Sequence, residues 1–158
     1  MTRADRKVVE PGKGLKPTGS FVVKRDGNTG AFLQTKSGNA FSSYRDVEYG
    51  VPARSARDAE TQGLTRDDIR MIIPDRTLDR RIATGEPLKL EEADGIARLL
   101  RVVTMARRVF ENDALADEWL RTPNPALGNY IPIKMARSDL GGREVEGALG
   151  RIEYGVFG

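Results

Sequence analysis

The sequence of 158 residues contains no cysteine and no histidine. Without cysteine the chain forms neither a disulfide nor a cysteine-ligated zinc site, and without histidine it lacks the commonest general base and metal ligand. No run of 18 apolar residues is present, so a membrane-spanning helix is not expected. The basic N-terminus is not followed by the apolar segment of a secretory signal. These absences predict a cytoplasmic protein without a metal site.

Motifs for catalysis are also scarce. Nucleophile–base pairs built on cysteine or histidine are impossible, and no glycine-rich loop has the spacing of a phosphate-binding or dinucleotide-binding motif. Neighbouring carboxylates occur at Glu91/Glu92 and Glu144/Glu146, but they fall on expected amphipathic helices, where solvated surface charge is the usual role. We therefore expect a binding protein and not an enzyme, with no catalytic residue, no cofactor and no metal.

Charge is unevenly distributed along the chain, although the net charge is only +3. Residues 1–60 contain 11 basic and 7 acidic residues, residues 61–110 contain 10 and 8, and residues 111–158 contain 5 and 8. The N-terminal part of the chain is therefore basic and the C-terminal part acidic. This gradient favours phosphate contacts in the N-terminal part and a different partner for the C-terminal part, although many solvated surfaces share such a pattern.

Residues 1–60 are expected to form a flexible N-terminal arm. Residues 1–20 are rich in Lys, Arg, Gly and Pro and almost free of large apolar side chains, as in a disordered tail. The turn signal Asp26–Gly30 lies between two short apolar runs and predicts a hairpin over 21–35. An arm that orders on a partner or on nucleic acid is the alternative.

Two short helices are predicted around a tight turn in the next segment. The first begins after Thr65, a good N-cap, and must end before Pro74. The second follows a cap at Asp75, and its Leu78 and Ile82, four residues apart, are expected to point inward together. The outer side of this second helix then presents Arg76, Thr77, Arg80 and Arg81.

This arrangement favours a helix-turn-helix that binds DNA. Guanidinium groups pair with phosphate or with guanine edges, and a hydroxyl can bond either. The alternative is an exposed helix made soluble by arginines. Asp75 and Asp79 would oppose phosphate contacts on the same helix.

The longest helix is predicted over Leu90–Phe110. Its continuous apolar stripe comprises Ile96, Leu99, Leu100, Val103, Ala106 and Phe110. We interpret this helix as a central strut that joins the helix-turn-helix to the C-terminal segment. Part of the stripe could equally form a dimer seam.

Residues 112–158 carry regular helix signals and predict three short helices. Asp113 suits the N-cap of the first, which Pro123 and Pro125 terminate. The other boundaries are marked by Pro132 in the first turn of the second helix, Ser138 or Asp139 at its end, Gly141-Gly142 at the start of the third, and Gly155 after it.

The last of these helices has two contrasting sides. Its apolar stripe consists of Val145, Ala148, Leu149, Ile152 and Val156, and the opposite side carries Arg143, Gly147, Gly150, Arg151 and Tyr154. A glycine inside a helix costs about 1 kcal/mol relative to alanine. Two glycines facing away from the core indicate a docking face for a closely approaching partner, unless the helix is simply a frayed terminus.

The same C-terminal stretch resembles a known family. The matching residues are Ala116, Trp119-Leu120, Pro123-Asn124-Pro125-Ala126-Leu127-Gly128, Pro132, Leu140-Gly141, Val145, Leu149 and Arg151-Ile152-Glu153-Tyr154-Gly155. They are similar to the toxin-binding domain of Xre/MbcA/ParS-type antitoxins, and Arg76-Thr77-Leu78 with Arg80-Arg81 resembles the Xre-like helix-turn-helix of that family. The resemblance extends from near Leu64 to the C-terminus. One departure is Gly128-Asn129 in place of Gly-Gly, and asparagine is the next best residue for a left-handed backbone.

The resemblance implies a mainly α fold and an antitoxin of a type II toxin-antitoxin system. Such a protein would bind and occlude a RES-domain, NAD-consuming toxin and repress its own operon, as a homodimer or a hetero-oligomer with the toxin. It implies toxin contacts at Arg143, Gly147, Gly150, Arg151 and Tyr154, with Trp119 in the core beneath them, and DNA contacts at Arg76, Thr77, Arg80 and Arg81. The expected division is an arm over 1–60, a helix-turn-helix with the long helix over 61–111, and a toxin-binding domain over 112–158.

Two other functions stay open at this point. One is a stand-alone helix-turn-helix transcriptional regulator whose C-terminal domain dimerises. The other is an adaptor whose basic N-terminal arm binds RNA or an acidic protein.

Overall fold

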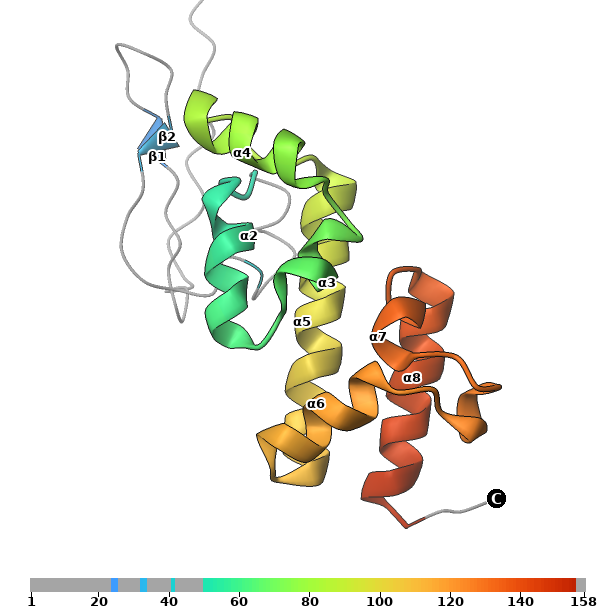
Figure 1. The fold of residues 1–158 in the computed structure, drawn as a ribbon. Coiled ribbons are helices and arrows are strands. Elements are labelled where there is room, and N and C mark those ends of the chain that lie inside the picture. The colour runs from blue at the N-terminus through green and yellow to red at the C-terminus, as the bar shows by residue number, and fades with distance from the viewer. Residues whose placement is uncertain (1–23, 26–31, 34–40, 42–49, 156–158) are drawn as a thin grey trace, which may run out of the picture.

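The computed structural model describes residues 24–25, 32–33, 41 and 50–155, and helices dominate this part of the chain (Figure 1). The helices are α2 Arg54–Asp58, η1 Ala59–Gln62, α3 Arg66–Arg70, α4 Asp75–Thr84, α5 Leu90–Phe110, α6 Asp113–Arg121, η2 Pro125–Leu127, α7 Pro132–Met135 and α8 Asp139–Glu153. The mainly α class expected from the sequence is confirmed. None of the helices in these residues is long and apolar enough to cross a membrane.

A short antiparallel pairing falls inside the expected hairpin. Strand β1 (Lys24–Arg25) pairs with β2 (Phe32–Leu33), with Lys24 opposite Leu33 and Arg25 opposite Phe32. The turn itself and the expected tail over 1–20 lie outside the described residues. This pairing is the only part of the hairpin prediction on which the structure bears.

Residues 51–60 are not part of a flexible arm, which corrects the expectation for the end of that segment. Val51, Ala53, Ala56 and Ala59 are buried, the last three at a spacing of three residues on one side of α2 and η1. The backbone N–H of Leu88 donates to the Val51 carbonyl at 2.8 Å. Small alanine side chains give a weak periodic signal, and this contact joins positions distant in sequence.

Helix α3 begins as the sequence predicts. The Asp68 N–H donates to Thr65 Oγ1 at 3.2 Å and the Thr65 N–H donates to Asp68 Oδ2 at 2.8 Å, a reciprocal capping box. Helix α4 starts one residue earlier than expected. Asp75 is its first helical residue, and its N-cap is Pro74, which has no capping side chain.

Helix α5 has the predicted limits and forms the centre of the molecule. In Figure 1 it runs between α2–α4 on one side and α6–α8 on the other. The expected apolar stripe is confirmed, with Phe110 partly buried and the other members buried: Ile96, Leu99, Leu100, Val103 and Ala106. Burial of each large side chain stabilises the fold by roughly 1.5–3 kcal/mol, so this helix carries much of the core.

The C-terminal helices follow the predicted punctuation with shifts at their ends. The N-cap of α6 is Asn112 and not Asp113, since Asn112 Oδ1 accepts the Leu115 N–H at 3.1 Å. The left-handed turn before α7 is confirmed, with φ of 65° at Gly128 and 62° at Asn129. Asparagine therefore preserves the turn where the family pattern has glycine.

Helix α8 begins at Asp139, two residues before the expected start, and Ser138 is its N-cap. Gly141 and Gly142 consequently lie inside the first turns and are buried. A Cβ atom at Gly141 would stand 2.1 Å from the Met135 carbonyl oxygen, and one at Gly142 would stand 2.9 Å from the Arg98 side chain. These glycines permit close packing of α8 on its neighbours and do not mark a helix end.

Candidate functional site

The outer face of α8 is a continuous exposed stripe, while its inner side packs into the core. Val145, Ala148 and Leu149 are buried, and α8 packs against α5 and α7. At 100° per residue the opposite side presents Leu140, Arg143, Gly147, Gly150, Arg151 and Tyr154. We call these six residues the α8 stripe. From Leu140 to Tyr154 it spans about 21 Å.

The two glycines in the α8 stripe have no packing role within the described chain. A Cβ atom at Gly147 would meet only the Arg151 guanidinium, at 3.7 Å, and one at Gly150 would meet nothing within 4 Å. This contrasts with Gly141 in the same helix, where the backbone of α7 forbids a side chain. The fold alone therefore leaves the cost of glycine at 147 and 150 unexplained.

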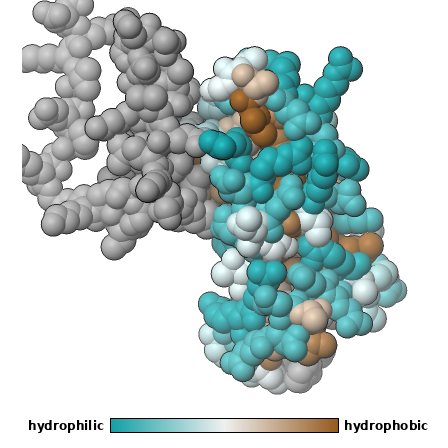
Figure 2. Space-filling model, turned by 60° about the vertical axis from the view of Figure 1, so that its left-hand side comes forward, coloured by the Kyte–Doolittle hydropathy of each residue, from teal (hydrophilic) through white to brown (hydrophobic). Residues whose placement is uncertain are grey.

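The ends and charges of the α8 stripe are also available to a partner. Leu140 is 71% exposed and Tyr154 is 79% exposed. Arg143 pairs with Asp139 at 3.0 Å, but both side chains are more than half exposed, and a surface pair of this kind is worth less than about 1 kcal/mol. On the face drawn in Figure 2, apolar residues form small separate patches on a hydrophilic surface. In the α8 stripe itself, two glycines and two arginines lie between Leu140 and Tyr154, so a partner would rely on close shape and a few anchors and not on a broad apolar area.

The outer side of α4 differs from its prediction at two residues. Arg76 and Arg80 are exposed and Thr77 is half-buried, with Arg80 paired to Glu86 at 3.1 Å. Arg81, expected on the outside, is only 5% exposed, and its guanidinium pairs with Glu92 of α5. Arg81 follows Leu78 by three residues and thus lies on the same side of the helix.

Ile82 shows the reverse change. It is 38% exposed, although its position four residues after Leu78 predicted an inward side chain. Leu78 itself is fully buried. The core extends under α4 at Leu78 and Arg81 but not at Ile82, so the position of α5 decides which side of the last turn is covered.

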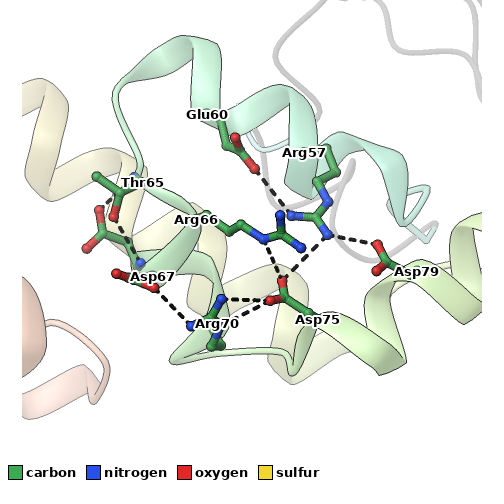
Figure 3. Close-up of polar contacts among 9 residues, drawn as sticks. Arg57, Glu60, Thr65, Arg66, Asp67, Arg70, Asp75 and Asp79 are labelled. Carbon is green, nitrogen blue, oxygen red and sulfur yellow. Dashed lines mark hydrogen bonds and ion pairs between the residues drawn. The ribbon is translucent and has the colours of Figure 1, made fainter.

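Carboxylates on α4 do not stand free, because arginines from α2 and α3 surround them (Figure 3). Asp75 accepts from Arg66 Nε at 3.2 Å and from Arg70 Nε and Nη2 at 3.0 and 2.9 Å. Arg57 Nη2 reaches Asp75 at 3.5 Å and Asp79 at 2.8 Å. The expected opposition of Asp75 and Asp79 to phosphate is thus largely offset within the protein.

The pKa values of two of these groups reflect the network. Desolvation raises the pKa of the Asp75 carboxyl, but hydrogen bonds from Arg70 and Arg66 together outweigh it, and the net pKa lies below its ordinary value. The hydrogen bond to Asp79 is the main cause that raises the pKa of Arg57. Both groups are therefore charged at neutral pH.

Trp119 lies at the edge of the core beside α5. It is partly buried, and its ring packs on Phe110 with centroids 5.9 Å apart and planes at 44°. The core role is confirmed in part, since the Trp119 side chain is only partly buried.

Sequence reasoning missed a set of contacts that ties α5 and α6 to the end of η1 and the start of α3. Arg121 Nη2 donates to the Asp68 carboxylate at 2.7 Å and to the Gly63 carbonyl at 3.3 Å. Arg107 Nη1 donates to the Gln62 carbonyl at 3.2 Å. No local pattern pairs residues 53 positions apart. The only sequence signal is two arginines on the inner sides of otherwise amphipathic helices.

Comparison with known proteins agrees with this architecture. Residues 105–155 match the antitoxin Xre/MbcA/ParS C-terminal toxin-binding domain. An Antitoxin Xre from Yersinia enterocolitica (serotype O:8) is 37% identical over 86 residues, which cover 54% of this chain and 58% of that protein. An Antitoxin Xre from Pseudomonas putida (KT2440) is 34% identical over 84 residues, 53% of each chain.

A more distant relative carries a different name. The Prs ADP-ribosylating antitoxin of Sphingobium sp. (strain YBL2) is 29% identical over 90 residues, 51% of this chain and 57% of that protein. The chain thus spans somewhat more than half the length of the curated relatives that it matches. The matched domain contains α6, η2, α7 and α8 together with the end of α5. On this evidence residues 105–155 match the Xre/MbcA/ParS C-terminal toxin-binding domain, and somewhat more than half of the chain is similar to proteins named Antitoxin Xre.

Proposed function

We propose that the protein is a cytoplasmic antitoxin that binds its toxin through the α8 stripe. The observation that carries this proposal is the pair of glycines at 147 and 150, which face open space on an otherwise well packed helix. The stripe belongs to the domain that matches the toxin-binding family. A partner backbone can approach these glycines more closely than any side chain would allow.

The flanking residues supply anchors for the same contact. Leu140 and Tyr154 stand at the two ends of the stripe and would each bury an exposed apolar side chain on a toxin. Arg143 and Arg151 would donate hydrogen bonds to carbonyl or carboxylate groups at the rim. An aromatic side chain and arginines around a flat centre are the composition typical of interface hot spots.

A RES-domain toxin that consumes NAD is the partner we propose. The family resemblance supports this identity. The name of the Sphingobium relative also refers to ADP-ribosylation, a reaction that consumes NAD. The occluding element would be α8, laid over the mouth of the toxin's active site.

We further propose that α4 binds operator DNA and represses the operon. Arg76, Thr77 and Arg80 are the contacts in this proposal, because their side chains reach the surface. Arg81 is not among the proposed DNA contacts, since its guanidinium is buried and paired with Glu92. Binding to two half-sites would require at least two copies of the chain.

The toxin contact is tested by the double substitution Gly147→Leu and Gly150→Leu. Leucine at both positions fits the free protein, because a side chain there meets open space, yet it would hold a toxin backbone several ångströms away. Co-expression with the neighbouring toxin, followed by pull-down and a growth assay, should show lost binding and lost protection with unchanged circular dichroism.

A control replaces two exposed residues of α6, Ala114→Leu and Glu118→Leu, which places two leucines elsewhere on the surface. This control should keep both binding and protection. If the glycine variant still neutralises the toxin, the α8 stripe is not the docking face. A protein that dimerises and binds DNA but captures no toxin would instead support the stand-alone regulator.

A further inference from the structure

Three arginines from two helices converge on a single carboxylate at the start of α4 (Figure 3). Arg57 comes from α2, while Arg66 and Arg70 come from the two ends of α3. Their guanidinium nitrogens lie between 2.9 and 3.5 Å from the oxygens of Asp75. Arg57 also pairs with Glu60 and Asp79, and Arg70 also pairs with Asp67. Asp75 is the carboxylate that contacts all three guanidinium groups of this cradle.

The cradle is open to solvent on the side of α3. The side chains of Arg66 and Arg70 are 56% and 53% exposed, and that of Asp75 is 24% exposed. Within the described chain Arg66 makes no ion pair other than the one with Asp75. An anion arriving from solvent can therefore reach these guanidinium groups without unfolding any helix.

The chemistry of the cradle suits a phosphate as well as a carboxylate. Guanidinium groups bind both anions through the same charge-assisted hydrogen bonds. The N-cap of α4 is Pro74 and offers no capping side chain, so the positive end of the helix dipole adds to the attraction. Arg76, proposed to contact DNA, is the next residue on the same helix.

We propose that Arg57, Arg66 and Arg70 form a binding site for a backbone phosphate of DNA, which the Asp75 carboxylate occupies in the free protein. On binding, the arginines would exchange Asp75 for the phosphate oxygen, so Asp75 acts as a built-in competitor that weakens association. The inference rests on the DNA-binding part of the proposed function. It adds three arginines outside α4 to the nucleic-acid surface and gives Asp75 a regulatory role.

The first test compares Asp75→Asn with the unchanged protein by fluorescence anisotropy on a labelled operator duplex. Asparagine keeps the size of the side chain but removes its charge. This frees Arg66 and leaves Arg57 and Arg70 with one carboxylate fewer, beside their remaining pairs with Glu60, Asp79 and Asp67. We expect about tenfold tighter binding at low salt, the size of one charge-assisted hydrogen bond. The plot of log K against log salt should steepen by about 0.9 for each additional phosphate contact.

A control separates this local effect from a general gain of positive charge. Glu118→Gln changes the net charge by the same amount on α6, where the exposed carboxylate makes no ion pair within the described residues. Its affinity and salt slope should stay close to those of the unchanged protein. If Asp75→Asn and Glu118→Gln have equal effects, the phosphate site is refuted.

A second pair of variants keeps the test decisive even if Asp75→Asn folds poorly. Arg66→Ala with Arg70→Ala should weaken DNA binding and flatten its salt slope, and should abolish the gain caused by Asp75→Asn. Arg101→Ala with Arg108→Ala removes the same charge from exposed positions on α5 and serves as the control. Equal losses in the two arginine pairs would overturn the proposal.

Loss of the phosphate site and loss of DNA binding give different experimental results. If Arg76→Ala with Arg80→Ala weakens DNA binding while Asp75→Asn has the same affinity as Glu118→Gln, DNA binding by α4 is supported and the phosphate site is refuted. If neither the unchanged protein nor Asp75→Asn binds the duplex, the DNA-binding function and the site that depends on it both fail.

Discussion

Replacement of Arg121 by methionine should destabilise the protein far more than loss of an ordinary surface arginine. Its guanidinium joins α6 to α3 through the Asp68 carboxylate at 2.7 Å, and the Asp68 side chain is only 5% exposed. Methionine preserves most of the apolar stem but leaves the carboxylate without its cation. Breaking a buried pair from one side costs about 3–5 kcal/mol.

The lower end of that range applies here. The Arg121 side chain is 26% exposed, so water can partly replace it, and Asp68 keeps its hydrogen bond from the Thr65 N–H. We therefore expect a loss of about 3 kcal/mol in the free energy of unfolding. For a domain of this size that corresponds to a fall of roughly 10 °C in Tm.

Urea unfolding followed by circular dichroism measures this loss, with Arg143→Met as the matched control. Arg143 makes an ion pair between two side chains that are 74% and 61% exposed, so its removal should cost less than about 1 kcal/mol. Hydrogen exchange should show the Arg121 variant losing protection first at the start of α3. Equal stability of the two variants would refute the view that this pair fastens the two halves of the molecule together.

Substitutions at four single sites give further expected outcomes. Because folding lowers the pKa of Asp75, its contribution to stability is present above the ordinary carboxyl pKa of about 3.9 and is lost as pH falls below it. The free energy of unfolding should therefore fall less steeply with decreasing pH in Asp75→Asn than in the unchanged protein. Identical pH curves for the two proteins would contradict this. Gly141→Ala should destabilise by about 1–3 kcal/mol, since its Cβ would overlap the Met135 carbonyl, whereas Gly150→Ala should stabilise by up to about 1 kcal/mol in the same urea assay. Arg81→Ala should lower the free energy of unfolding by about 3 kcal/mol and leave the salt dependence of DNA binding unchanged. A weaker salt dependence in this variant would show that Arg81 contacts DNA.

Local signals in the sequence determined the positions of α3 to α8 to within about two residues at their starts. The stripe from Ile96 to Phe110 has a single period, and the structure gives α5 the predicted limits. Thr65 is the predicted N-cap of α3, and Asn129 takes the left-handed conformation that its position required. Such features depend on a few neighbouring residues, whose backbone preferences hold wherever the helix packs.

Only the tertiary structure decided which side of each helix end is covered. Arg81 and Ile82 occupy adjacent positions that both follow Leu78 by about one turn, and α5 covers the first and not the second. Gly141 requires glycine because α7 approaches it, whereas Gly150 faces open space. Periodicity fixes the angle at which a side chain projects from the axis of its helix. The residue that it contacts comes from a distant part of the chain, as when Arg121 contacts Asp68.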